Sequence, residues 1–211
     1  MSGRGEQEEK PVYAMGVDIG QVHDYSTLVI VKVDDSTTLG DTRLRNFVLK
    51  GLVKWPLGTP YPKIADDIAR TCRKLRANGG EIESVTVDAT GVGNAVVELI
   101  ERTFRKHDLR VEVEPFIFTS ESKRDLIGNL KVLHQEDRLR FADAKPNTTY
   151  AQLLKELIDE LINYEVRIED HGPEKYGVFK TGKHDDLVTA LALATMNSSF
   201  EIARPRATYV P

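Results

Sequence analysis

The chain has 211 residues, of which 40% are hydrophobic and 29% charged, a composition typical of one ordinary globular domain. Its 29 basic and 33 acidic residues give a formal net charge of −4, which argues against a protein that coats nucleic acid through bulk positive charge. The single cysteine, Cys72, cannot form an internal disulfide, which excludes a secreted disulfide scaffold, and no apolar run approaches the roughly 20 residues of a membrane-spanning helix.

The first part of the chain predicts three consecutive strands. Short runs rich in Val, Ile and Leu at 12–17 and 27–33 flank the segment 20–26, a pattern typical of an antiparallel hairpin. A third strand is expected at 44–54, where apolar and polar residues alternate after the turn-like segment 34–42.

The rest of the chain predicts helices alternating with strands. Apolar residues recur at helical spacing, as in Ile64, Ile68 and Cys72 ahead of the stop signal at 78–80, and Ser120 is expected to cap a later helix. Helices are expected at 61–77, 94–106, 120–135, 148–162 and from about 185 onward, strands at 84–87 and 111–118, and a late hairpin at 163–168 and 176–180.

This order of elements predicts an α/β fold. Consecutive antiparallel strands followed by β-α-β units imply a mixed five-stranded sheet flanked by helices, with the late hairpin as an addition. No repeat or linker divides the body, so we expect a disordered lead-in at 1–10, one domain at 11–200 and a flexible tail at 201–211.

Four aspartates stand out because of their places in the predicted elements. Asp18 ends the first strand, Asp88 follows the strand at 84–87, and Asp185 and Asp186 open the last helix. If the strands of Asp18 and Asp88 are parallel neighbours, their carboxylates emerge together at one edge of the sheet. Carboxylates gathered there would repel one another without cations, and hard oxygen ligands suit Mg²⁺ or Mn²⁺. Two such ions about 4 Å apart support phosphodiester hydrolysis.

Each of these acids also has an ordinary structural interpretation. Asp18 could begin a turn. Asp24 could approach the metals from the hairpin loop, but an aspartate there is more often a turn former. Asp88 could cap the helix that follows it, and Asp185 and Asp186 could be a helix cap and a first-turn acid that favours the helix dipole. The joint pattern, in this topological order, favours the metal-site interpretation.

The sequence resembles the ribonuclease H-like nucleases, and within them the nuclease domain of the phage terminase large subunit, of the resolvase-like branch. The resemblance covers about residues 12–198. It is carried by Asp18-Ile19-Gly20 with Asp24-Tyr25-Ser26, by the segment Asp88-Ala89-Thr90-Gly91-Val92-Gly93, and by His184-Asp185-Asp186-Leu187-Val188 before Ala190-Leu191-Ala192.

The resemblance implies a two-metal endonuclease that cuts concatemeric double-stranded viral DNA during genome packaging and leaves 3′-hydroxyl and 5′-phosphate ends. Asp18 would bridge two Mg²⁺ or Mn²⁺ ions, Asp88 would hold one, and the pair Asp185 and Asp186 the other. Related sequences often have a further acid at the position of Thr189. Its absence leaves open which member of the pair is the principal ligand, with Asp186 slightly favoured.

The resemblance also implies partners. A complete large terminase begins with a packaging ATPase domain, for which this chain has no room, and it works with a portal protein and a small terminase subunit. The expected substrate is double-stranded DNA, with no membrane partner, and the expected location is the host cell cytoplasm rather than the mature virion.

Basic residues that could contact DNA lie on two predicted elements and beside the acidic pair. A solvated charged face is the plain alternative for those on the helix at 120–135, and positive charge there would give affinity without sequence choice. The candidates are Lys123, Arg124 and Lys131 on that helix, Lys175, Lys180 and Lys183 on or near the late hairpin, and His184.

The sequence has features of three other functions besides that of the terminase nuclease. A Holliday-junction resolvase would share the acids but should dimerise and prefer branched DNA. The segment 177–184 matches a phosphate-binding loop except that His184 replaces the Ser or Thr that holds Mg²⁺, and too little chain follows to build a nucleotide-binding sheet. The segment 18–20 also resembles the first phosphate motif of actin-like ATP-binding proteins, which need two domains.

Overall fold

The computed structural model describes residues 10–20, 24–39, 42–91, 94–167, 175–177 and 184–201. Within this part of the chain a mixed sheet has the strand order β5-β4-β1-β2-β3-β6, with β9 also pairing with β3, and β7 and β8 form a separate two-stranded sheet. The strands are β1 Val12–Asp18, β2 Thr27–Leu39, β3 Thr42–Lys54, β4 Glu81–Asp88, β5 Glu112–Phe116, β6 Leu139–Phe141, β7 Glu165–Arg167, β8 Lys175–Gly177 and β9 Ser199–Glu201. The helices are α1 Tyr61–Ala77, α2 Asn94–Lys106, α3 Ser120–Gln135, α4 Thr149–Asn163 and α5 Asp186–Ala194.

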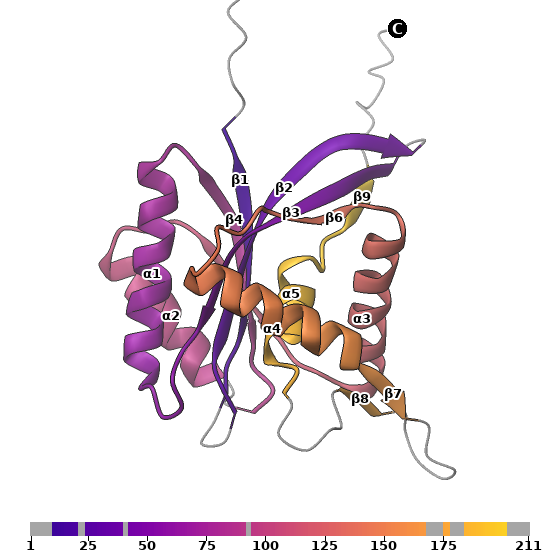
Figure 1. Cartoon of the computed structure of the whole chain (residues 1–211). Coiled ribbons are helices and arrows are strands. Elements are labelled where there is room, and N and C mark those ends of the chain that lie inside the picture. The colour runs from indigo at the N-terminus through magenta and orange to yellow at the C-terminus, as the bar shows by residue number, and fades with distance from the viewer. Residues whose placement is uncertain are drawn as a thin grey trace, which may run out of the picture.

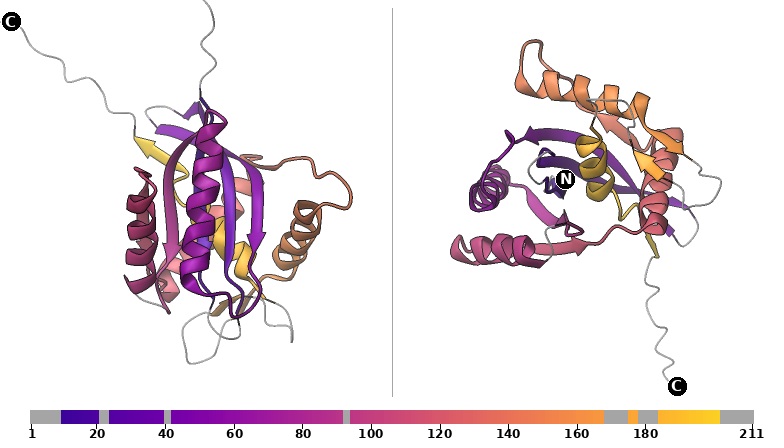
Figure 2. Two further views of the ribbon diagram at one scale, coloured as in Figure 1. Left: turned by 90° about the vertical axis from the view of Figure 1, so that its left-hand side faces the viewer. Right: turned by 90° about the horizontal axis from the view of Figure 1, so that it is seen from below.

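Helices cover both faces of the large sheet, so the molecule has three layers (Figures 1 and 2). Helices α1 and α2 pack on one face, and α3, α4 and α5 pack on the other. Successive side chains of a strand point to opposite faces. In β1, Met15 and Val17 therefore belong to the core under α1 and α2, whereas Ala14 belongs to the core under α5.

Helix α5 lies directly against β1 at Gly16. A Cβ atom at this position would be 2.0 Å from the carbonyl oxygen of Ala190 and 2.5 Å from the backbone nitrogen of Ala194, distances that no side chain tolerates. Every residue of α5 is buried, and its alanines allow the close approach. The glycine therefore lets the helix start beside the end of β1.

The predicted pairing of the central strands is confirmed. Strands β1 and β2 are antiparallel, and β1 and β4 are parallel neighbours, with Val17 opposite Val87. All five predicted helices are present, each within one residue of its expected limits where the sequence gave them. The prediction of a turn at 34–42 was wrong over most of its length, because β2 continues to Leu39 and stays paired with β3 through Leu39 and Thr42.

The sheet has two strands more than the five expected. The additional strands, β6 and β9, have only three residues each and pair with different parts of β3. Arg138 is buried beside them, and its guanidinium donates hydrogen bonds to the carbonyl oxygens of Arg45 and Ser198. These edge strands are therefore held by tertiary contacts rather than by a hydrophobic repeat of their own.

The start of α3 also differs from expectation. Thr119, not Ser120, is the capping residue: its hydroxyl accepts a hydrogen bond from the backbone N–H of Ser122, and the Ser122 hydroxyl accepts one from the N–H of Thr119.

Among the helices of the described segments, none has the length and apolar character needed to cross a bilayer. Most of the expected lead-in, 1–10, and tail, 201–211, lies outside the described residues. The exceptions are Lys10 and Glu201, and Glu201 of β9 pairs with Thr42.

Candidate active site

Two of the predicted acids come together at the ends of neighbouring parallel strands. Val17 of β1 pairs with Val87 of β4. Asp18 and Asp88 follow them directly and are the last residues of the two strands. Val17 and Val87 pack on the face covered by α1 and α2. Because successive side chains of a strand point to opposite faces, the carboxyl groups of Asp18 and Asp88 point to the face covered by α5.

Helix α5 brings the other two acids to the same place. Asp185 immediately precedes the helix and Asp186 begins it, and the Thr27 hydroxyl donates a 2.8 Å hydrogen bond to the carbonyl oxygen of Asp186, tying the helix start to β2. The result is a cleft of about 420 Å³. Its lining residues are Asp18, Ile19, Gly20, Asp24, Asp88, Thr90, Gly91, Phe118, Lys123, His184, Asp185, Asp186 and Thr189.

Asp186 is the most deeply placed member of the acidic pair. It is 6% exposed, and its Oδ2 atom is buried with no hydrogen-bond partner in the described part of the chain. Burial raises the pKa of its carboxyl group to about 6, against the opposing influence of His184 and Lys54. A buried carboxylate oxygen without a partner costs free energy unless a cation or a proton meets it.

Asp18 is in a similar position. Burial raises the pKa of its carboxyl group well above the ordinary value, and the negative charges of Asp186, Asp88 and Asp185 raise it further. Lys123 acts in the opposite direction but does not offset these effects. Asp88, Asp185 and Asp186 therefore each make ionisation of Asp18 more costly.

Asp185 is more exposed and has a cationic partner. Its Oδ2 atom lies 3.4 Å from Nζ of Lys123, and both side chains are 28% exposed. The side chain makes no capping hydrogen bond to α5, although the residue occupies the cap position. A Cβ atom on Gly177 of β8 would lie 3.0 Å from the same carboxylate oxygen, so the second sheet approaches the cleft here.

Asp88 is held by a local turn rather than as a cap of α2. Its Oδ1 atom accepts a 2.8 Å hydrogen bond from the backbone N–H of Thr90, and α2 begins only at Asn94. The Thr90 hydroxyl in turn accepts a 2.7 Å hydrogen bond from the N–H of Phe118. The carboxyl group is therefore fixed in direction at the rim of the cleft.

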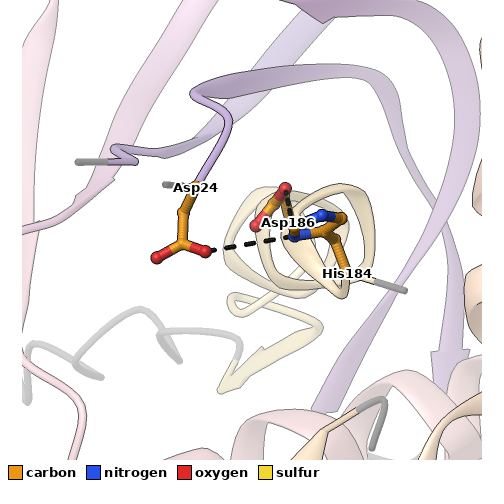
Figure 3. A group of neighbouring side chains, drawn as sticks. All are labelled: Asp24, His184 and Asp186. Carbon is orange, nitrogen blue, oxygen red and sulfur yellow. Dashed lines mark ion pairs between the residues drawn. The ribbon is translucent and has the colours of Figure 1, made fainter. Parts of the chain in front are cut away.

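His184 lies between two carboxylates (Figure 3). Its Nδ1 atom is 3.9 Å from Oδ1 of Asp24 and 3.9 Å from Oδ2 of Asp186. Each of the three residues offers one atom that could bind a metal ion, and these atoms lie within 4.8 Å of one another. The imidazole meets the ring of Tyr25 edge-on, with centroids 5.5 Å apart, and Nζ of Lys54 lies 4.1 Å from the centroid of the same ring. The sequence left Asp24 as a turn former or as a residue that approaches the metals, and the fold brings it beside His184.

Glu160 of α4 is a residue that sequence reasoning missed. It is 4% exposed, and its Oε2 atom accepts 3.0 Å hydrogen bonds from the backbone N–H groups of Leu187 and Val188, in the first turn of α5. Burial raises the pKa of this carboxyl group to about 8. The available signal was an acid three residues after Leu157, on the apolar side of a helix.

The candidate DNA-contacting residues are distributed unevenly. Lys123 and His184 line the cleft. Arg124, one residue and about 100° further round α3, is exposed beside Asp125, and Lys131 lines a separate hollow between α3 and α4. The backbone of Lys175 lies in β8 but its side chain is outside the described part, as are Lys180 and Lys183 entirely.

The donor set of the cleft fits hard divalent cations. Carboxylate oxygens come from three separate elements, and two of the acids have raised pKa values. Within the described segments, the buried Oδ2 atom of Asp186 has no hydrogen-bond partner. Oxygen-rich sites of this kind suit Mg²⁺ and Mn²⁺. Asp18, Asp88 and Asp186 all line the cleft, and Asp185 faces Lys123. Among the described residues, the acids and histidine whose ligand atoms lie within 4.8 Å of one another are Asp24, His184 and Asp186.

A mixed sheet with acids at the ends of two adjacent parallel strands, and a helix that adds further acids from across the cleft, defines a protein of the ribonuclease H-like class. Residues 61–198 match the family model described as the terminase RNaseH-like domain. This match covers more than half of the chain, which therefore belongs to that family.

Solved structures with similar folds are terminase nuclease domains. The human cytomegalovirus terminase nuclease domain is 10% identical, with a TM-score of 0.57 over 89% of this chain and 83% of its own. Its Mn-soaked form gives 11% and 0.56 over 88% and 83%. The nuclease domain of the g2p large terminase from bacteriophage SPP1, with bound Mn, gives 13% and 0.50 over 88% and 86%. At identities this low, the structural similarity shows a shared fold and no more. No curated protein sequence matches the chain.

Proposed function

We propose that the protein is a metal-dependent endonuclease that hydrolyses phosphodiester bonds of double-stranded DNA, as the nuclease part of a viral terminase large subunit. The observation that carries the proposal is the gathering of Asp18, Asp88, Asp185 and Asp186 in one cleft, where a buried oxygen of Asp186 has no hydrogen-bond partner among the residues that the structure describes. Membership of the terminase RNaseH-like family supports it, as do the two similar nuclease domains that were soaked with Mn or have bound Mn.

In this proposal the cleft holds two Mg²⁺ or Mn²⁺ ions. Asp18, whose carboxyl group is influenced by the charges of both Asp88 and Asp186, would be the ligand shared by the two ions, and Asp88 and Asp186 would each hold one of them. Such ions, when bound, lower the pKa of a coordinated water and stabilise the charge on the leaving oxygen.

The other groups of the cleft bind and orient the substrate. Lys123 offers an ammonium group that already faces the acids, and it can approach a non-bridging phosphate oxygen without leaving Asp185. His184, held between Asp24 and Asp186, can donate a hydrogen bond to phosphate or hold a proton near the reacting group. Nothing among the described residues of the cleft resembles a base-reading helix rich in Arg, Asn or Gln, so weak sequence preference is expected.

The biological setting is part of the same proposal. A terminase nuclease cuts concatemeric viral DNA during genome packaging, in the host cytoplasm, together with an ATPase domain, a portal protein and a small subunit. Family membership supports this setting.

Digestion of supercoiled plasmid tests the proposal. Wild-type protein should nick and linearise plasmid with Mn²⁺ or Mg²⁺ and should be inactive in EDTA, and Asp18→Ala should reduce the rate by at least 100-fold because the carboxylate shared by both ions is lost. Asp143→Ala, which changes an exposed aspartate outside the cleft, is the matched control and should cut normally.

Two results would contradict the proposal. Activity that survives both EDTA and Asp18→Ala would come from some other source than the cleft. Cutting of four-way junctions with none of linear duplex would assign the protein to the resolvases instead.

A further inference from the structure

A concentration of basic side chains lies on the layer of α1 and α2, across the sheet from α5. It occupies the C-terminal half of α1 and the turn between α2 and β5, and six of its seven members are Lys or Arg. Its members, here called the α1–α2 basic patch, are Arg70, Arg73, Lys74, Arg76, Lys106, His107 and Arg110.

The positive charge of the patch is only partly neutralised. Arg70 pairs with Asp67, which Lys63 also contacts, and His107 lies 3.9 Å from Asp66. Within the described segments no carboxylate forms an ion pair with Arg73, Lys74 or Lys106. This excess of charge is carried by a protein whose net charge is −4.

The surface of the patch is hollowed rather than flat. Two adjacent hollows, of about 290 and 550 Å³, share Arg70, Arg73 and His107 as lining residues. The Arg76 guanidinium donates a 2.7 Å hydrogen bond to the carbonyl oxygen of Arg110, which joins α1 to the far side of the larger hollow. Asp66 lines the smaller hollow and Asp108 the larger, but the basic side chains outnumber them. Guanidinium and ammonium groups gathered on one surface suit phosphate oxygens.

The cleft itself is poorly suited to attract DNA. Five aspartates line it, and its only basic side chains in the described segments are Lys123, which faces Asp185, and His184. Basic groups elsewhere on the molecule would therefore add to the affinity for a duplex, which carries one charge per roughly 1.7 Å.

We propose that the α1–α2 basic patch binds the phosphate backbone of duplex DNA beyond the cleft. This inference rests on the proposed function, which makes DNA the substrate. The start of α1 is close to the cleft, because the Tyr61 hydroxyl donates to the carbonyl oxygen of Gly20, a lining residue. Arg73 is twelve residues further along the helix, on the order of 18 Å, which corresponds to about five phosphates along one strand.

Binding of a fluorescent 30-base-pair duplex, measured by anisotropy in EDTA, tests the inference without cleavage. Arg73→Gln with Lys74→Gln should weaken binding about tenfold at 50 mM salt and lower the slope of log K against log salt by about 2, because two phosphate contacts are lost. Lys106→Gln with Arg110→Gln should behave alike. The control is Lys145→Gln with Lys155→Gln, which removes the same charge from exposed positions elsewhere and should change affinity by less than twofold.

The outcomes separate this inference from the nuclease proposal. Unchanged duplex affinity in both patch variants, with thermal unfolding like that of wild type, overturns the patch even if the protein cuts plasmid. Poly-L-glutamate that binds wild type and not the patch variants, with duplex affinity unchanged, overturns it in favour of an acidic protein partner. Patch-dependent duplex binding by a protein that never cuts plasmid supports the patch and removes the nuclease proposal alone.

Discussion

Asp186 combines two properties that conflict in the metal-free protein. Its carboxyl group is buried, and one of its oxygens has no hydrogen-bond partner among the described residues, so its ionised form is costly. The residue also lines the cleft, beside Asp24 and His184. A residue of this kind lowers the stability of the empty fold in return for a binding site.

Replacement of Asp186 by Asn should stabilise the metal-free protein. The pKa of the carboxyl group is about 6 in the folded protein and 3.8 as the reference, so the folded state holds the proton more tightly. The stability that this proton supplies is present below pH 3.8 and is lost as the pH rises through 6. Asp186→Asn should therefore raise the free energy of unfolding by about 2–3 kcal/mol at pH 7.5, and by less than about 1 kcal/mol near pH 4.

Urea unfolding in EDTA at the two pH values measures this difference. Asp143→Asn, at an exposed position, serves as the control and should leave the stability unchanged. Equal stabilities of wild type and Asp186→Asn at pH 7.5 would show that the carboxylate is not strained in the folded protein.

At the scale of single elements, the position of α5 depends on its contacts with α4 and with β1. Glu160 of α4 accepts two hydrogen bonds from the first turn of α5, and Gly16 of β1 gives the helix room to lie on the sheet. Neither residue lines the cleft, yet both determine where Asp186 stands.

Substitutions of Glu160 should separate its hydrogen bonds from its charge. Glu160→Ala leaves two buried N–H groups without an acceptor and should cost about 2–4 kcal/mol. Glu160→Gln keeps an acceptor oxygen, carries no buried charge and should cost less than about 1 kcal/mol. Urea unfolding at pH 7.5 distinguishes them, and equal losses in both variants would mean that the N–H groups do not depend on this side chain.

Gly16→Ala should disturb the sheet–helix contact. The added Cβ would lie 2.0 Å from a backbone oxygen of α5, so the helix must shift, and we expect a loss of at least about 2 kcal/mol with weaker metal binding. Gly128→Ala is the matched control, because a Cβ there, on an exposed position of α3, meets nothing within 4 Å and should raise stability by up to about 1 kcal/mol. Thermal unfolding of the two variants in parallel gives the comparison, and equal effects would contradict the proposed close contact.

The sequence was informative about elements that carry their own periodic pattern. The apolar stripe of α1 and the stop signal after Ala77 predicted that helix to the residue, and the runs rich in Val, Ile and Leu at 12–17 and 27–33 predicted the hairpin. Strands β6 and β9 escaped prediction because three residues show no period, and their pairing depends on distant contacts of Arg138. The extension of β2 likewise depends on its partner strand rather than on local composition.

The candidate site was predictable in outline and not in detail. Strand-end acids followed from the pattern around Asp18 and Asp88, because parallel strands end at a common edge. The different surroundings of Asp185 and Asp186 could not be predicted from their neighbouring positions in the sequence, because Lys123 of α3 contacts only Asp185 of the two. Glu160 contacts residues 27 and 28 positions away, a relation that only the folded chain reveals.

Over the whole molecule, charge is divided between two regions. Acids are gathered in the cleft at the strand ends, while unneutralised basic groups lie on the layer of α1 and α2. A small net charge of −4 conceals this separation. Divalent cations should therefore reduce the repulsion between the cleft and a DNA backbone, and they should stabilise the fold by mass action.

Calorimetric titration with Mn²⁺ at pH 7.5 tests most directly whether residues 18, 88 and 186 act as one cation site. Wild-type protein should bind Mn²⁺, and Asp18→Asn, Asp88→Asn and Asp186→Asn should each weaken the tightest binding by at least tenfold, while Asp143→Asn leaves it unchanged. Mn²⁺ affinities that are the same in wild type and all three cleft variants would contradict a shared cation site.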